Sequence, residues 1–364
     1  MKLYSWGANT HGQLGQGVTS EEVLKPTEIF TDHLPLNEIV SIEIGGNQSY
    51  LIAKDGSVFG CGWNNCGQLG HEANEENLFI KLNHLENFKI KQISCKWDTC
   101  YAITDKHYCI GWGGNQYGQL GLPPEQLKKT LDPVIICYNA VQVAAGLRHC
   151  AILLNYGKVV TAGTNKRGQL GRPSNEENPM FDFVSELKEV EMISSGQNFS
   201  LALTKDKKLY GWGCNKFGQL GIVPDSCPFT EKPVEIQLSP PLTKCELLDD
   251  ITIMCGWTHT LLRTAGKKLF AWGRNNYGQL GSIADSYSIE LIKVLPGVKI
   301  RKIAAGAEHN LVYTEEGFLR SWGWNEHGSC GDNSISPVIL HPTTILAPDK
   351  KSKMSKRNGL EQAI

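Results

Sequence analysis

The chain has 364 residues, of which 41% are apolar and 20% are charged, so it can bury a core and is not disordered by composition. Lys and Arg number 36 against 37 for Asp and Glu, which gives a formal net charge of -1. This balance excludes a protein whose whole surface binds nucleic acid or anionic lipid. No apolar stretch approaches the ~20 residues that a membrane span needs.

A glycine-rich motif recurs along the chain. Gly-Gln-Leu-Gly occurs six times at intervals of 50 to 60 residues, and a degenerate seventh copy runs from Gly328 to Gly331. Gly-x-Asn precedes every copy, and a Trp stands before that Gly in five of the seven, with Cys61 and Ala162 in the other two. Self-similarity at this period indicates a repeat architecture. The Gln residues of the six full copies are Gln13, Gln68, Gln119, Gln169, Gln219 and Gln279.

The predicted strands follow this repeat in chain order. The first unit supplies only two strands, at residues 3–7 and 26–29. Each later unit opens with a second motif, small-Gly-x-x-His, followed by an apolar segment, a turn and another strand; the clearest hairpins lie at 201–212 and 261–272. Such short strands and turns predict a four-stranded antiparallel sheet in each unit. The motif has His149, His259 and His309 in three units, and we expect Ser49, Thr99 and Phe199 at the equivalent positions.

One small sheet cannot cover both of its faces. Radial stacking of several sheets solves this problem and protects the sheet edges, so we predict an all-β β-propeller. The glycines then supply positive φ in the turns, and the Leu and Trp side chains of the repeat pack between blades. A solenoid is the alternative architecture, but no helical periodicity recurs.

The combined Trp-Gly-x-Asn-x-x-Gly-Gln-Leu-Gly and Ala-Gly-x-x-His pattern resembles the regulator-of-chromosome-condensation repeat over residues 1–346. The resemblance implies a seven-bladed β-propeller. Because the first unit supplies only two strands, we expect six full blades and an incomplete closing blade. Residues 347–364 follow as a basic tail that we expect to be disordered. Its basic residues are Lys350, Lys351, Lys353, Lys356 and Arg357.

Within this family, the stretches at 144–149, 255–259 and 321–328 look most like those of exchange factors linked to secretion. The resemblance implies a guanine nucleotide exchange factor, or a similar regulator, for a small GTPase in secretion or vesicle trafficking. Exchange is a differential-affinity process without covalent chemistry, so no enzyme activity, cofactor or metal is expected. The alternative is a non-catalytic interaction platform for partners such as vesicle-tethering proteins. Chromatin binding is disfavoured by the neutral charge and by the lack of a basic N-terminal arm.

The turns of the small-Gly-x-x-His motif recur at fixed spacing and should gather near one rim of the propeller. In the family's nuclear member an aspartate of such a turn is essential for exchange, and Asp98 matches it here, so the resemblance implies Asp98 as the catalytic residue. The segment at 71–93 has no extra residues for that member's inserted β-wedge. The alternative for the histidines is purely structural, as hydrogen-bond donors or acceptors to neighbouring blades. The remaining predicted partner-binding residues are Trp97, Arg148, His149, Trp257, His259, Glu308 and His309, because aromatic and Arg residues are common at binding hot spots.

Three further features complete the expectations. The longest insertion, at about 223–246, is rich in proline and is interpreted as a surface excursion rather than a central strand or a wedge. The twelve cysteines contain no Cys-x-x-Cys pair, which favours reduced, buried thiols over zinc or disulfides. The N-terminus has no signal-peptide core, so we expect the protein in the cytoplasm and also in the nucleus. The balanced charge predicts no nucleic-acid partner.

Overall fold

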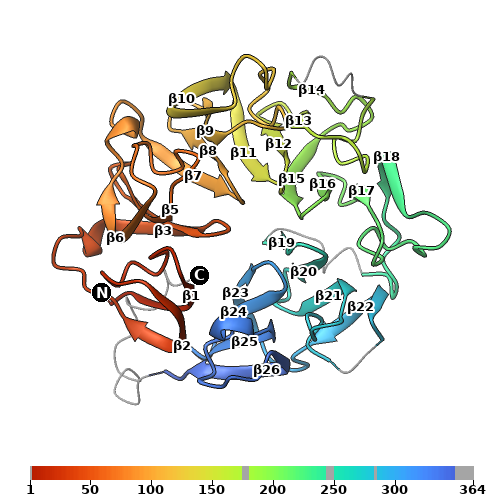
Figure 1. Ribbon diagram of the computed structural model, residues 1–364. Helices are drawn as coiled ribbons and strands as arrows, with labels where there is room; N and C mark the ends of the chain where they lie inside the picture. The colour runs from red at the N-terminus through yellow and green to blue at the C-terminus, as the bar shows by residue number, and fades with distance from the viewer. Residues whose placement is uncertain (1, 174–179, 243–249, 283–284, 349–364) are drawn as a thin grey trace.

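The computed structural model describes residues 2–173, 180–242, 250–282 and 285–348, whose regular elements are β-strands and three-residue 3-10 helices. They form six four-stranded sheets and one two-stranded sheet. Seen along the axis, the sheets follow one another around a ring in chain order (Figure 1). The prediction of an all-β β-propeller is therefore confirmed, with six four-stranded blades.

Each four-stranded blade is an antiparallel meander in which strands adjacent in sequence are also adjacent in the sheet. The first three blades are β3 (Ile39–Ile44), β4 (Gln48–Ala53), β5 (Val58–Trp63) and β6 (Glu75–Lys81); β7 (Ile90–Cys95), β8 (Thr99–Thr104), β9 (Cys109–Gly114) and β10 (Lys129–Cys137); and β11 (Ala140–Ala145), β12 (His149–Leu154), β13 (Val159–Gly163) and β14 (Asp182–Phe183). The last three are β15 (Val190–Ser195), β16 (Phe199–Thr204), β17 (Leu209–Cys214) and β18 (Phe229–Glu235); β19 (Thr252–Cys255), β20 (His259–Arg263), β21 (Leu269–Arg274) and β22 (Tyr287–Val294); and β23 (Ile300–Ala305), β24 (His309–Thr314), β25 (Leu319–Trp324) and β26 (Val338–Leu346). The short helices are η1 (Leu36–Glu38), η2 (Asn83–Leu85) and η4 (Glu326–Gly328).

The two-stranded sheet pairs β1 (Tyr4–Asn9) with β2 (Ser20–Glu28) and lies between the last blade and the first four-stranded one (Figure 1). Both strands contact η4 of the last blade, and the hydroxyl of Ser49 in β4 donates to the Gln13 carbonyl at 2.7 Å. The sequence placed the second of these strands at 26–29, whereas β2 starts six residues earlier, at Ser20. The tail predicted at 347–364 lies outside the described residues from 349 onward.

The proline-rich insertion at 223–246 is only partly an excursion. Its residues 229–235 form β18, the outermost strand of its blade, so this part is an edge strand rather than an excursion, and it is not a central strand, as expected. Pro233 is tolerated there because an edge strand needs hydrogen bonds on one side only. Residues 243–249 of the same insertion lie outside the described residues.

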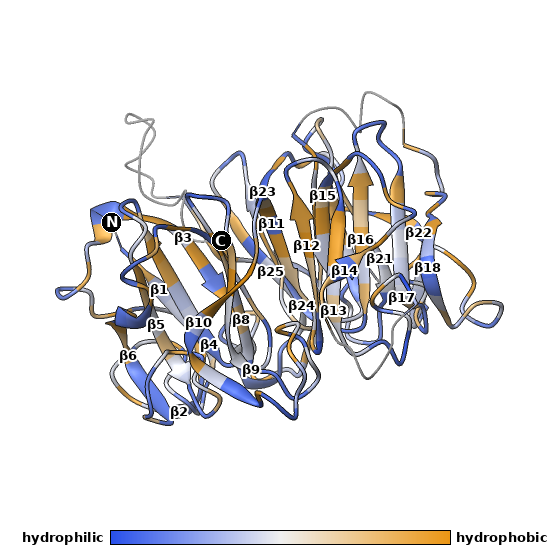
Figure 2. Ribbon diagram, turned by 90° about the horizontal axis from the view of Figure 1, so that it is seen from above, coloured by the Kyte–Doolittle hydropathy of each residue, from blue (hydrophilic) through white to orange (hydrophobic). Residues whose placement is uncertain are grey.

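Apolar residues concentrate along the strands, and polar residues dominate the loops at their ends (Figure 2). Each hydrophobic cluster draws side chains from two neighbouring blades; one of them joins Tyr50 and Leu69 of one blade to Ile93 and Trp112 of the next. No helix in the described ranges is long and apolar enough to cross a membrane. The eleven cysteines within those ranges carry no disulfide, and Cys245 lies outside them.

A tryptophan–carbonyl hydrogen bond recurs between successive blades. The indole Nε1 of Trp272 donates to the backbone carbonyl of Gln219 in the preceding blade at 2.9 Å, and Trp272 is 1% exposed. Trp6 repeats the bond with Ser329, which stands in the degenerate seventh motif, at 3.2 Å. The repeated Trp and Gln residues of the sequence therefore meet across blade interfaces. The same bond joins Trp112 to Gln68, Trp212 to Gln169 and Trp322 to Gln279.

The loop of the repeat is held by its own polar side chains. In the copy at 213–221, the Asn215 side-chain oxygen accepts from the Leu220 backbone N–H at 2.9 Å, and the Gln219 side-chain oxygen accepts from Phe217 N–H at 2.8 Å. The glycines permit both the turn and a close approach between blades. At Gly168, with φ of 72°, an added Cβ would lie 2.2 Å from the Thr230 carbonyl oxygen. The motif is thus a loop that folds on itself and packs against the next blade.

We expect Trp272→Phe to lower the free energy of unfolding by about 1–3 kcal/mol, because it leaves the Gln219 carbonyl buried without its donor. Trp6→Phe should lower the free energy of unfolding by less, since Trp6 is half-buried and water can reach its partner, the Ser329 carbonyl. Urea unfolding followed by circular dichroism measures both variants. Equal losses in the two variants would contradict this account.

Candidate functional site

The turns between the first and second strands of the blades lie at the same end as the loops between the third and fourth strands, because neighbouring strands are antiparallel. We call this surface the turn face. Backbone hydrogen bonds connect its turns around the axis: Gln197 N–H donates to the Trp257 carbonyl at 3.0 Å, and Trp257 N–H donates to the Ala307 carbonyl at 2.7 Å. Leu147 N–H donates in the same way to the Gln197 carbonyl. The predicted site residues therefore stand on a rim that successive blades hold together.

The strand register assigns the first residue of each second strand. His149 lies opposite Gly163 at the start of β12, and Gln48 lies opposite Gly62 at the start of β4. The equivalent of the histidine is therefore Gln48, and the sequence assignment to Ser49 was wrong by one residue. The reason is the double glycine at Gly45 and Gly46, which allows two alignments of the motif.

Two of the predicted histidines are buried between blades. The Nε2 of His149 lies 3.0 Å from the Ser200 hydroxyl, and that of His259 donates to the Asn310 side-chain oxygen at 2.7 Å. Burial lowers the pKa of His149 to about 3, so this imidazole is neutral at physiological pH. Both rings join neighbouring blades, which fits the structural alternative, and their partner-binding role stays a prediction.

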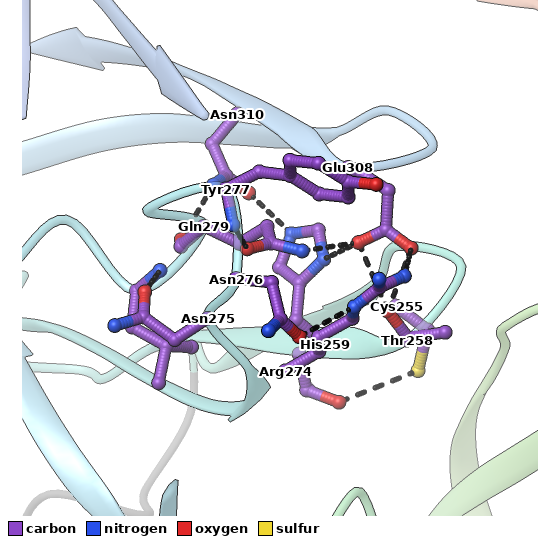
Figure 3. Close-up of polar contacts among 12 residues, drawn as sticks. Cys255, Thr258, His259, Arg274, Asn275, Asn276, Tyr277, Gln279, Glu308 and Asn310 are labelled. Carbon is purple, nitrogen blue, oxygen red and sulfur yellow. Dashed lines mark hydrogen bonds and ion pairs between the residues drawn. The ribbon is translucent and has the colours of Figure 1, made fainter. Parts of the chain in front are cut away.

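Glu308 is the centre of a buried polar network between the last two blades (Figure 3). Its carboxylate accepts from the Thr258 hydroxyl at 2.7 and 2.9 Å and from the Gln279 amide at 2.5 Å. The Arg274 guanidinium lies 3.6 Å away, and the His259 Nδ1, at 3.8 Å, is too distant for a hydrogen bond. Thr258 and Gln279 thus donate to this carboxylate, and the Arg274 cation lies beside it.

Electrostatics in this network favour the charged carboxylate. Burial alone raises the pKa of Glu308, but the nearby His259 and the donors Thr258 and Gln279 outweigh it, and the pKa is lowered below its ordinary value. Arg274 extends the network to the surface, with its guanidinium 4.7 Å from the Phe217 ring centre and 4.8 Å from that of Tyr277. The buried Glu308 carboxylate therefore helps to hold Arg274 against these two aromatic rings at the surface.

A second cluster on the turn face contains three of the predicted residues. Trp97 is 42% exposed and meets the edge of Trp63 with ring centres 5.9 Å apart, while the exposed Arg148 lies 4.4 Å above the Tyr117 ring. Half-buried Asp98 directly follows Trp97 in the same turn. We call these five residues the Trp97 patch. It joins blades β3–β6, β7–β10 and β11–β14.

Asp98 is held in place within this patch. The Thr99 hydroxyl lies 3.1 Å from its carboxylate and itself donates to the Gly114 carbonyl at 2.8 Å. Burial raises the pKa of Asp98, and the nearby Thr99 hydroxyl and the charge of Arg148 oppose that rise. A fixed, half-buried carboxylate beside an exposed Trp and Arg is suited to polar recognition of a partner.

The other predicted residues lie apart from this patch. Trp257 and His309 are half-buried on the opposite side of the rim, and burial lowers the pKa of His309 to about 4. Sequence reasoning missed Trp63, Tyr117 and Arg274, which occupy the variable positions around the repeat asparagine. Aligning the seven copies and asking which variable positions carry aromatic or cationic side chains would have found them.

Comparison with known proteins decides the family, since the RCC1-like domain matches residues 2–358. The chain belongs to the RCC1-like domain family. It is 33% identical to the secretion-regulating guanine nucleotide exchange factor of Bos taurus, over 92% of this chain and 77% of that protein. It is 32% identical to the ultraviolet-B receptor UVR8 of Arabidopsis thaliana, over 99% of this chain and 69% of the receptor.

Solved structures agree with this RCC1-like assignment. Prp20p from Saccharomyces cerevisiae, described with its binding properties to Gsp1p and histones, is 26% identical, with a TM-score of 0.82 over 95% of this chain and 86% of Prp20p. The family that the sequence resembled is therefore confirmed, as is the similarity to the secretion-regulating exchange factor. The relatives' names span an exchange factor and a light receptor, so the function must be argued from the site.

The Glu308 network predicts a pH-dependent difference between the chain and its Glu308→Gln variant. At neutral pH the variant should lose about 1–3 kcal/mol of unfolding free energy, because the new amide directs N–H groups at existing donors. The pKa of Glu308 is lowered in the folded chain, so its stabilising contribution is complete above its ordinary pKa of 4.5 and is lost as the pH falls through the folded value. Thermal melts from pH 7 to pH 3 should show the gap narrowing in acid. A constant gap would contradict the lowered pKa.

Proposed function

We propose that this protein is a guanine nucleotide exchange factor, or an exchange-factor-like regulator, for a small GTPase linked to secretion or vesicle trafficking. Its similarity to the secretion-regulating exchange factor and to Prp20p supports the proposal. The observation that carries it is the Trp97 patch, in which Trp97, Asp98 and Arg148 come together on the turn face from two blades.

The chemistry of the patch suits nucleotide exchange. An exchange factor needs only to bind the nucleotide-free GTPase more tightly than the loaded one, and this difference in affinity expels the nucleotide. Trp97 offers a large, rigid apolar contact, and Arg148 and Asp98 offer charges of opposite sign whose positions Tyr117 and Thr99 fix. No covalent step, cofactor or metal enters this mechanism.

The test mixes the purified protein with Ran-, Rab- and Rho-type GTPases that carry fluorescent GDP and follows nucleotide release. We expect acceleration with one type of GTPase. Asp98→Ala and Trp97→Ala should each reduce this acceleration by ~30-fold or more, the size of a hot-spot truncation of about 2 kcal/mol. Asp105→Ala is the matched control, because Asp105 is an exposed aspartate of the same blade in the turn between β8 and β9, at the opposite end of the sheet.

The melting temperatures of these variants separate function from folding, and Asp98→Ala should melt with the parent chain. Full exchange activity in Asp98→Ala would remove Asp98 from the site. If nucleotide release is accelerated for none of these GTPases, the interaction platform becomes the favoured function. Binding of vesicle-tethering proteins to the parent chain but not to Trp97→Ala would then support it.

The cytoplasmic and nuclear location remains a prediction, which imaging of the tagged protein tests.

We also propose that the β1–β2 sheet is an incomplete seventh blade. Its Trp6 makes the indole bond that joins successive blades, and Gly328 of the last motif packs against Leu24 as other motif glycines pack against the outer strand of the next blade. Trp6 is half-buried, whereas Trp112 and Trp212 are fully buried, which is consistent with two absent inner strands in the described residues.

This proposal predicts uneven backbone protection. Among the described strands β1 pairs with β2 alone, so one of its edges lacks a hydrogen-bonded neighbour. Hydrogen exchange measured by mass spectrometry should be faster in peptides from β1 and β2 than in those from β5 or β9, which have partners on both sides. Equal protection of β1 and β9 would show that the blade is completed by other residues.

A further inference from the structure

The blade β7–β10 contains two pairs of cysteines that face each other across neighbouring strands. Cys95 lies opposite Cys100 in β7 and β8, and Cys109 lies opposite Cys137 in β9 and β10. Directly opposed residues of antiparallel strands have Cα atoms about 4.5–5.5 Å apart. This separation falls within the ~4.4–6.8 Å range of Cα atoms joined by a disulfide. All four thiols are free in this structure.

The two pairs differ in their access to solvent. Cys95 and Cys100 are both buried, with 5% and 0% exposure. Cys109 is also buried, at 0%, but Cys137 is only half-buried and is the last residue of the outermost strand β10. One pair is therefore enclosed, and the other combines an accessible thiol with a buried neighbour.

The residues that flank Cys109 and Cys137 also lie close together across the two strands. Tyr108, just before β9, and Tyr138, just after β10, meet edge to face with ring centres 5.1 Å apart. The neighbouring Cys109 thiol lowers the pKa of Cys137, whereas burial raises that of Cys109 well above its usual range. The half-buried Cys137 is thus the better thiolate, and the buried Cys109 lies opposite it in the strand register.

We propose that Cys137 is a peroxide-reactive thiol and that Cys109 is its resolving partner, so that the two form a reversible cross-strand disulfide. The site takes a small hydroperoxide as oxidant. It is independent of the Trp97 patch, because it lies on the outer part of the blade near the turns opposite the turn face.

The reaction balances in two steps. The Cys137 thiolate attacks one peroxide oxygen, so that an S–O bond forms, the O–O bond breaks and hydroxide leaves, giving a sulfenic acid at Cys137. The Cys109 thiol then loses its proton and attacks the Cys137 sulfur, so that an S–S bond forms, the S–O bond breaks and a second hydroxide leaves and is protonated. Two thiols are oxidised to one disulfide, and one hydrogen peroxide molecule is reduced to two molecules of water.

The position of the pair gives the disulfide a structural consequence. Cys137 ends β10, and only Tyr138 and Asn139 separate it from β11, the innermost strand of the next blade. The Ala140 N–H at the start of β11 already donates to the His107 carbonyl at 2.9 Å, just before β9 begins. A disulfide between Cys137 and Cys109 would therefore tie the connection from β10 to β11 covalently to the start of β9.

The experiment exposes the full chain to stoichiometric hydrogen peroxide, blocks the remaining thiols with N-ethylmaleimide and maps the peptides by mass spectrometry. We expect a Cys109–Cys137 disulfide that dithiothreitol reverses. Cys137→Ser should abolish it, and in Cys109→Ser, or in Cys109→Ala if the serine variant is unstable, Cys137 should persist as a sulfenic acid that dimedone labels. Cys100→Ser is the matched control, because it removes one thiol of the enclosed pair and should leave the Cys109–Cys137 bond unchanged.

Two outcomes would overturn the proposal. One is a peroxide-treated chain in which Cys137 remains free or forms no more disulfide than the enclosed Cys95–Cys100 pair does. The other is an absence of dimedone labelling at Cys137 in both Cys109 variants. Under reducing conditions, Cys137→Ser should release nucleotide from the GTPase and melt as the parent chain does. Failure of this proposal therefore leaves the proposed exchange function untouched.

Discussion

The propeller depends on one interaction, the hydrogen bond from a buried indole N–H to a backbone carbonyl in the preceding blade. A carbonyl buried between sheets must find a donor, and Trp supplies one at the end of a large apolar ring that also fills the interface. The glycine loop presents that carbonyl because Asn215 and Gln219 fix its backbone from within. Where Trp is replaced by Cys61, the thiol still lies 3.5 Å from the Gln13 carbonyl, so the same acceptor keeps a weaker partner.

The rim of the turn face shows how the same interfaces position polar groups. Gln279 contributes its backbone carbonyl to Trp322 and its side-chain amide to Glu308, so one residue serves both packing and electrostatics. A buried carboxylate is tolerable only when donors surround it, and here Thr258, Gln279 and the nearby Arg274 do so. The carboxylate in turn holds Arg274 between two aromatic rings at the surface.

Charge at equivalent positions of the repeat distinguishes the blades. The residue before the histidine position is Asp98, Arg148 and Glu308 in three of the blades, and each has a different environment. Arg148 stacks on Tyr117 and stays exposed, Asp98 is half-buried, and Glu308 is enclosed. A uniform scaffold thus presents a non-uniform surface, which is what recognition of a single partner orientation requires.

Much of this molecule could be predicted from the sequence because its information is local and repeated. Gly-Gln-Leu-Gly, the preceding Asn and the hairpin turns act within a few residues, and their recurrence set the fold class, the strand pairs and the family. Burial and partner choice act across blades, and the sequence alone could not decide them: His149 could be structural or partner-binding and Glu308 was predicted to bind a partner, whereas both are enclosed by residues from a neighbouring blade.

The sequence by itself therefore determined the repeating sheet, the loop that closes it and the radial architecture, because each rests on backbone conformation and short-range hydrogen bonds. Only the tertiary structure decided which rim residues face solvent, that Gln48 rather than Ser49 occupies the histidine position, and which thiols oppose one another. Those properties depend on strand register and on contacts between residues about fifty positions apart, and neither can be read from local pattern alone.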